Sequence, residues 1–85
     1  RDGAPQARVQ LAKLYYQRGL LEESRRYVNE AMKMMEPPSV DALWLGLRIE
    51  RKMGNKALEG NYAAILRLRY PTSPEYAAFL KGNFE

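Results

Sequence analysis

Apolar residues recur along this chain at the three- and four-residue spacing of amphipathic α-helices, and glycine or proline lies between the stretches. The pattern predicts five helices, at about residues 5–18, 21–35, 40–53, 56–69 and 74–81. The third stretch has the densest apolar run, Ala42–Leu47. Because Gly46 within that run lowers helix stability, it predicts a close approach by a neighbouring helix.

Local signals mark where the predicted helices begin and end. Gly19 and Gly54 follow the first and third helices, where glycine takes up a left-handed cap conformation. Prolines at 37–38 and 71 stop the second and fourth helices, since proline lacks the N–H of the helix ladder. Ser39 and the pair Thr72-Ser73 supply hydroxyl N-caps for the third and fifth helices.

The two turn glycines are 35 residues apart, and the same offset pairs Leu14 with Ile49 and Tyr27 with Tyr62. A helix–turn–helix repeated at about this period is typical of tetratricopeptide repeats, which stack into a superhelix. We therefore expect a single all-α domain over residues 1–85, folded as a right-handed superhelix. It would comprise repeat 1 (5–38), repeat 2 (39–71) and a capping helix (72–85) that covers the exposed end of the stack.

Composition narrows the functional classes. The chain has 14 Lys and Arg against 10 Asp and Glu, a net charge of +4, and it has no cysteine or histidine. No histidine general base, cysteine nucleophile, glycine-rich phosphate loop or metal-ligand cluster is present. We expect no enzymatic activity, cofactor or metal. No stretch has the roughly 20 apolar residues of a membrane span, so we expect no membrane contact by these residues.

Stacked repeats use the first helix of each pair to line a concave binding surface. At the 35-residue offset, the first helices give three recurring series: Val9, Trp44 and Phe79; Lys13, Arg48 and Asn83; Tyr16 and Arg51. Trp and Arg are common binding hot spots. We predict a partner-binding face made of Val9, Lys13, Tyr16, Trp44, Arg48, Arg51, Lys52 and Phe79. The alternative is that Trp44 packs between helices and the charged groups are only solvated.

Other features favour structural roles. Met32, Met34, Met35 and Met53 are expected to fill gaps in the core rather than to form a pliable binding surface. Arg25 and Arg26 lie on a second helix, where we expect solvated outer surface. Nucleic acid is not an expected partner, since the basic excess is slight and the recurrent inner positions are mostly aliphatic or aromatic.

The first repeat resembles the tetratricopeptide signature in the stretch from Gln17 to Ser24, preceded by Ala12 and by Tyr15-Tyr16. The second repeat departs from that pattern. Leu47 replaces the small residue, Glu50-Arg51 replaces the tyrosines and Glu59 replaces the usual alanine, whereas Pro71 matches the closing proline.

The stretches Ala42–Arg51 and Leu66–Glu75 resemble the carboxy-terminal repeat of the PilF/PilW family, the pilotins of type IV pilus (fimbrium) biogenesis. The resemblance implies an outer-membrane lipoprotein on the periplasmic face in a Gram-negative bacterium, assisting secretin assembly. The implied partner is a type IV pilus secretin subunit or another pilus assembly protein. The alternative is a generic adaptor or co-chaperone that grips a carboxylate with Lys13 and Arg48, although the partnering asparagines are missing.

The chain begins at Arg1 inside a continuing pattern, so we expect a fragment whose further repeats, lipidated cysteine and targeting signal would lie upstream. A first helix without its upstream neighbour would expose Val9, Leu11 and Tyr15. We therefore expect possible self-association of the fragment.

Overall fold

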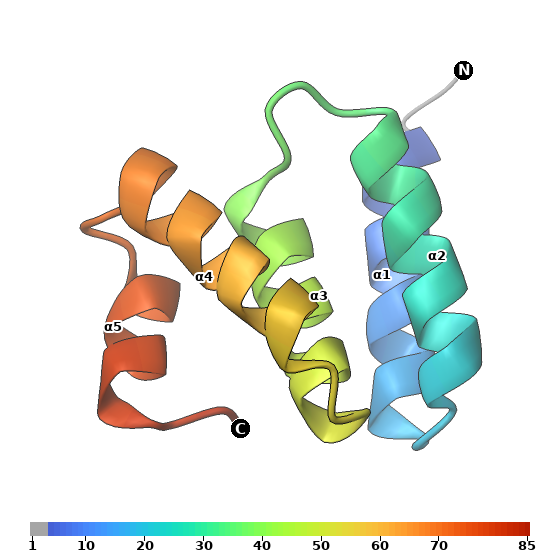
Figure 1. Ribbon diagram of the computed structural model, residues 1–85. Helices are drawn as coiled ribbons and strands as arrows, with labels where there is room; N and C mark the ends of the chain where they lie inside the picture. Colours follow the sequence, from blue (N-terminus) through green and yellow to red (C-terminus); the bar gives the residue numbers. More distant parts are fainter. Residues whose placement is uncertain (1–3) are drawn as a thin grey trace.

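The computed structural model describes residues 4–85, which form an all-helical, compact fold with no strand in that range. Five helices follow one another: α1 (Ala4–Gln17), α2 (Leu21–Lys33), α3 (Val40–Lys52), α4 (Lys56–Arg69) and α5 (Pro74–Lys81). Each predicted helix lies within two residues of these bounds. α1 packs on α2 and α3 packs on α4, so the chain forms two helical hairpins followed by α5 (Figure 1).

The predicted caps account for these bounds. Gly19 and Gly54 both have a φ of 78°, in the left-handed region that closes the first helix of each hairpin. The Ser39 hydroxyl accepts a hydrogen bond from the Ala42 N–H, and the Ser73 hydroxyl accepts one from the Tyr76 N–H. Local sequence chemistry therefore sets the helix ends.

α3 is the central helix, because it contacts each of the other four. Its side chains divide between two buried clusters, one shared with α1 and α2 and the other with α4 and α5. Gly46 lies in its middle, where an added Cβ would come within 2.9 Å of the Met32 Cε and 3.2 Å of the Tyr62 Cε2. The predicted close approach at Gly46 is confirmed.

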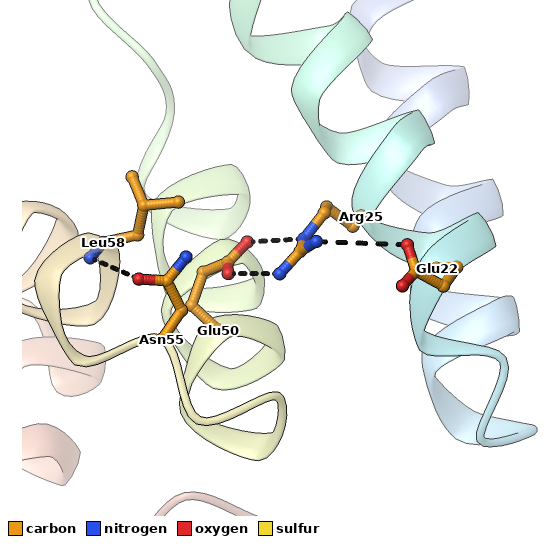
Figure 2. Close-up of polar contacts among 5 residues, drawn as sticks. All are labelled: Glu22, Arg25, Glu50, Asn55 and Leu58. Carbon is orange, nitrogen blue, oxygen red and sulfur yellow. Dashed lines mark hydrogen bonds and ion pairs between the residues drawn. The ribbon is translucent and has the colours of Figure 1, made fainter.

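An ion pair joins the two hairpins. The Arg25 guanidinium on α2 donates two hydrogen bonds to the Glu50 carboxylate on α3, at 3.0 and 2.7 Å (Figure 2). The Glu50 side chain is only 2% exposed and the Arg25 side chain 29%. The hydrogen bond from Arg25 to Glu50 raises the pKa of Arg25, although burial acts in the opposite direction. The expectation that Arg25 is merely solvated is wrong, because a buried carboxylate on the other hairpin requires a charged partner.

Residues 82–85, which we call the return segment, fold back from α5 toward α3 (Figure 1). The turn begins at Gly82, whose φ of 72° is accessible to glycine at little cost. The Asn83 N–H then donates to the Ala78 carbonyl at 2.9 Å, which closes the end of α5. This turn directs Phe84 and Glu85 onto the surface of α3 and α1.

Candidate functional site

An open cleft of about 390 Å³ lies where the end of α1 meets the end of α3. We call it the α1–α3 cleft. It is lined by one buried tyrosine, several cations, one carboxylate from α4 and the return segment: Tyr16, Arg48, Arg51, Lys52, Gly54, Lys56, Glu59, Phe84 and Glu85. Residues from both hairpins and from the return segment therefore meet in one place.

Aromatic rings and guanidinium groups alternate along this cleft. The Arg48 Cζ lies 5.0 Å from the Tyr16 ring centroid and 5.3 Å from the Trp44 ring. The Trp44 ring stacks on Phe84, with centroids 6.0 Å apart and an interplanar angle of 21°. The Arg51 Cζ lies 3.9 Å from the Phe84 centroid. Each ring thus receives a cation on its electron-rich face, an arrangement worth about 0.5–2 kcal/mol per contact.

Glu85 brings the carboxylate to this cationic surface. Its Oε2 accepts a hydrogen bond from the Tyr16 hydroxyl at 2.8 Å and lies 3.5 Å from the Lys52 Nζ. The Tyr16 hydrogen bond and the charges of Lys52 and Arg48 lower the pKa of Glu85. Burial, followed by the Glu85 hydrogen bond and charge, raises the pKa of Tyr16 to about 12. The pair therefore holds one proton, on the tyrosine, across the neutral range.

Arg51, near the end of α3, is held in position by Glu59 in the first turn of α4. Its Nη1 donates to the Glu59 Oε2 at 3.1 Å, across the turn between α3 and α4. This contact fixes the guanidinium plane above Phe84. Because Arg51 is half exposed, we assign the pair a positioning role rather than a large effect on stability.

The structure gathers most of the predicted face around the return segment. Tyr16, Arg48, Arg51 and Lys52 line the cleft, and Trp44 borders it through its stacking on Phe84. Phe79 on α5 meets the edge of Phe84, with centroids 6.3 Å apart, and packs with Trp44 in the second buried cluster. Trp44 itself is half-buried, so the predicted groove and the alternative of helix packing both describe part of its surroundings.

Two residues of the predicted face, Val9 and Lys13, do not line the α1–α3 cleft. Val9 is only 4% exposed and belongs to the first buried cluster, so the expectation of an exposed Val9 is wrong. Leu11 and Tyr15 are half-buried. Lys13 pairs with Asp41 at the start of α3, with 3.4 Å between Nζ and Oδ2. α2 and α3 together cover the Val9 side of α1, which is why Val9 is not exposed.

Sequence reasoning missed Phe84 and Glu85. It placed Asn83 in a helical series with Lys13 and Arg48, but α5 ends at Lys81 and Asn83 lies beyond it. The available signal was Gly82, which predicts the end of α5 and hence a change in chain direction. The docking position of the following residues depends on contacts with distant helices, which no local pattern encodes.

The methionines are divided between core and surface. Met32, Met35 and Met53 pack against the first buried cluster, as expected, whereas Met34 is 49% exposed. Among residues 4–85, no three His, Cys, Asp or Glu side chains come together as metal ligands. None of the helices in this range combines the length and apolar character that crossing a membrane requires.

The α1–α3 cleft presents cations and aromatic faces. No protein-family model matches this chain, and no curated protein or solved structure matches it either. We therefore infer the function from the side chains of the cleft and their geometry.

Proposed function

We propose that this chain is a non-catalytic scaffold that binds a segment of a partner protein in the α1–α3 cleft. The observation that carries the proposal is the convergence of Tyr16, Trp44, Arg48, Arg51 and Lys52 on a short non-helical segment of the chain. Exposed Arg and half-buried aromatic side chains are the usual anchors of protein interfaces. A surface that already holds a short non-helical segment of its own chain has groups that can hold such a segment of a partner.

We also propose that the scaffold is of the tetratricopeptide type, with the hairpins stacked in a right-handed superhelix. Two observations support this proposal. The 35-residue offset pairs Gly19 with Gly54, and both close their helix with the same φ of 78°. Furthermore, α1 and α3, the first helices of the two hairpins, contact one another and carry the cleft residues between them.

Within this function, the resemblance of Ala42–Arg51 and Leu66–Glu75 to the pilotins supports a role in type IV pilus biogenesis. The partner would be a secretin subunit or a neighbouring pilus assembly protein, at the periplasmic face of a Gram-negative outer membrane. A basic cleft requires an acidic segment on that partner, since electrostatic complementarity guides association.

The experiment is a binding titration of the chain against the periplasmic segments of a type IV pilus secretin. The test variant is Arg48→Glu with Lys52→Glu, which reverses two charges at the cleft. The matched control is Arg69→Glu with Arg67→Glu, which reverses two charges on the exposed side of α4. Circular dichroism checks that both variants fold. We expect the parent and the control to bind and the cleft variant to lose at least about tenfold in affinity.

The result separates the two levels of the proposal. Equal loss in the cleft variant and the control would overturn the cleft as the binding site. No binding by the parent would overturn the pilus role, and the scaffold would then be tested with other acidic protein segments. Light scattering on the same samples tests the expected self-association, which a strict monomer at high concentration would contradict.

A further inference from the structure

We propose that the wall of the α1–α3 cleft formed by Tyr16, Trp44, Arg51 and Lys52 recognises a partner segment in which an aromatic residue is followed directly by an acidic one, and that Phe84-Glu85 covers this surface until such a segment displaces it. This inference rests on the proposed function and names both the chemistry of the partner and the regulation of the same site. The return segment serves as a template, because its contacts show which side chains the cleft accepts.

The aromatic position is defined on three sides. Phe84 stacks on Trp44 from α3, lies beneath the Arg51 guanidinium and meets the edge of Phe79 from α5. Stacking and edge contacts of this kind favour a planar ring over an aliphatic side chain of similar size. The Arg51 guanidinium adds a contact that only the face of a π-system provides. Phe, Tyr or Trp is therefore the required residue type.

The acidic position follows from charge. The cleft presents Arg48, Arg51, Lys52 and Lys56, and the one carboxylate that it receives from α4 is Glu59, which pairs with Arg51. Glu85 supplies the second negative charge, bonded to the Tyr16 hydroxyl and close to Lys52. A carboxylate therefore fits where an apolar or basic side chain would leave these cations unpaired.

Most of the return segment is exposed to solvent. It lies outside any helix, Phe84 is half-buried and Glu85 is exposed. The hydrogen bond of the Asn83 N–H caps α5 and makes no contact with the cleft. Its attachment rests on two side chains and on the high effective concentration that a short covalent link provides. A partner with the same two side chains and further contacts of its own competes for the same position.

The test uses Trp44, the single tryptophan of the chain, as a fluorescent reporter in direct contact with Phe84. The probe is the peptide acetyl-Gly-Asn-Phe-Glu-amide, titrated into the chain and into the variant Phe84→Ala with Glu85→Gln. The matched control is Leu68→Ala, which removes a similar apolar group from a position on α4 that is 72% exposed.

We expect the peptide to bind the Phe84→Ala/Glu85→Gln variant roughly tenfold or more tightly than the parent, since the two side chains of the variant no longer cover the surface that the peptide needs. Leu68→Ala should bind like the parent. Peptides with Ala in place of Phe, or Gln in place of Glu, should each bind the variant more weakly than the original peptide.

Several outcomes would overturn the inference. These are equal affinity of parent and variant, indifference to the Phe or Glu of the peptide, or dimers that exchange the return segment between two copies. One of these outcomes can occur while the Arg48→Glu/Lys52→Glu variant still loses affinity for the secretin segments. The proposed function then stands, and only the aromatic–acidic template fails. If the variant does not fold, the same comparison is made with Glu85→Gln alone, which keeps Phe84 in place.

Discussion

The two hairpins place different side chains at positions 35 residues apart, and the second hairpin uses several of these side chains for contacts outside itself. In the first, Ala12 and Ser24 are fully buried, and the Ser24 hydroxyl donates to the Ala12 carbonyl at 2.6 Å. The equivalent positions 35 residues later hold Leu47 and Glu59. In Figure 1, α1 and α2 lie alongside one another while α4 crosses α3 obliquely.

The paired positions before each turn glycine differ in the same way. Tyr15 stacks on Tyr27 within its own hairpin, with ring centroids 5.4 Å apart. Its equivalent, Glu50, instead binds Arg25 of the other hairpin (Figure 2). Tyr16 is buried, whereas its equivalent, Arg51, reaches out over Phe84.

The side chains of the second hairpin that differ from their counterparts 35 residues earlier therefore make identifiable contacts. Glu50 links the hairpins, Arg51 contacts the return segment and Glu59 holds Arg51. A position that is released from packing its own hairpin can serve contacts between units or with a ligand.

The largest effect should come from breaking the link between the hairpins. Glu50→Ala leaves the Arg25 guanidinium partly buried without its carboxylate, which should lower the free energy of unfolding by about 3 kcal/mol. That is a large part of the total stability of a domain this small. Urea denaturation measures the loss.

Two companion variants sharpen this result. Glu22→Ala should cost less than about 0.5 kcal/mol, because Glu22 is exposed and lies 3.9 Å from the Arg25 Nη1. Arg25→Met with Glu50→Leu should be more stable than Glu50→Ala alone, since an apolar pair leaves no buried charge. A Glu50→Ala variant as stable as Glu22→Ala would show that the buried pair does not hold the hairpins together.

A smaller difference in the free energy of unfolding should distinguish substitutions at positions 24 and 59, which are 35 residues apart. Ser24→Val removes a buried hydrogen bond and adds volume where two helices touch, which should cost about 2 kcal/mol. Glu59→Val should cost less than about 1 kcal/mol, because the side chain of its partner Arg51 is half exposed and the ion pair is therefore screened by solvent. Thermal or urea unfolding of the two variants gives the comparison, and equal losses would contradict it.

The smallest expected effect is a change with pH in how firmly the return segment docks on α1 and α3. The pKa of Glu85 is lowered from 4.5, so its contribution to docking is present above pH 4.5 and is lost as the pH falls through that lowered value. The pKa of Tyr16 is raised from 10.0 to about 12, so its contribution is present below pH 10 and is lost as the pH rises toward 12. Trp44 fluorescence should report both transitions, because Trp44 contacts Phe84.

Each limb of this profile has its own control. Glu85→Gln should abolish the acid transition, and Tyr16→Phe should abolish the alkaline one while preserving the packed ring. Far-ultraviolet circular dichroism should stay unchanged through the acid transition. An acid transition that persists in Glu85→Gln would assign it to another carboxylate and contradict the docking geometry.

Much of the helical framework could be predicted because its signals are local. Glycine at 19 and 54, serine at 39 and 73 and the prolines act on the residues beside them, so helix bounds were correct within two residues. The set of residues that meet at the α1–α3 cleft was harder to predict. The 35-residue offset selected Trp44, Arg48 and Arg51, which lie at the cleft, but it also selected Val9, which is buried.

The sequence by itself determined five amphipathic helices, their caps and a pairing into hairpins, since propensity, periodicity and turn chemistry act over a few residues. The tertiary structure decided which charges are buried and where the chain returns. Glu50 is buried because α2 places Arg25 within hydrogen-bonding distance of it. Phe84 and Glu85 lie in the α1–α3 cleft because three helices distant in sequence meet there, and such contacts depend on packing geometry that no local pattern specifies.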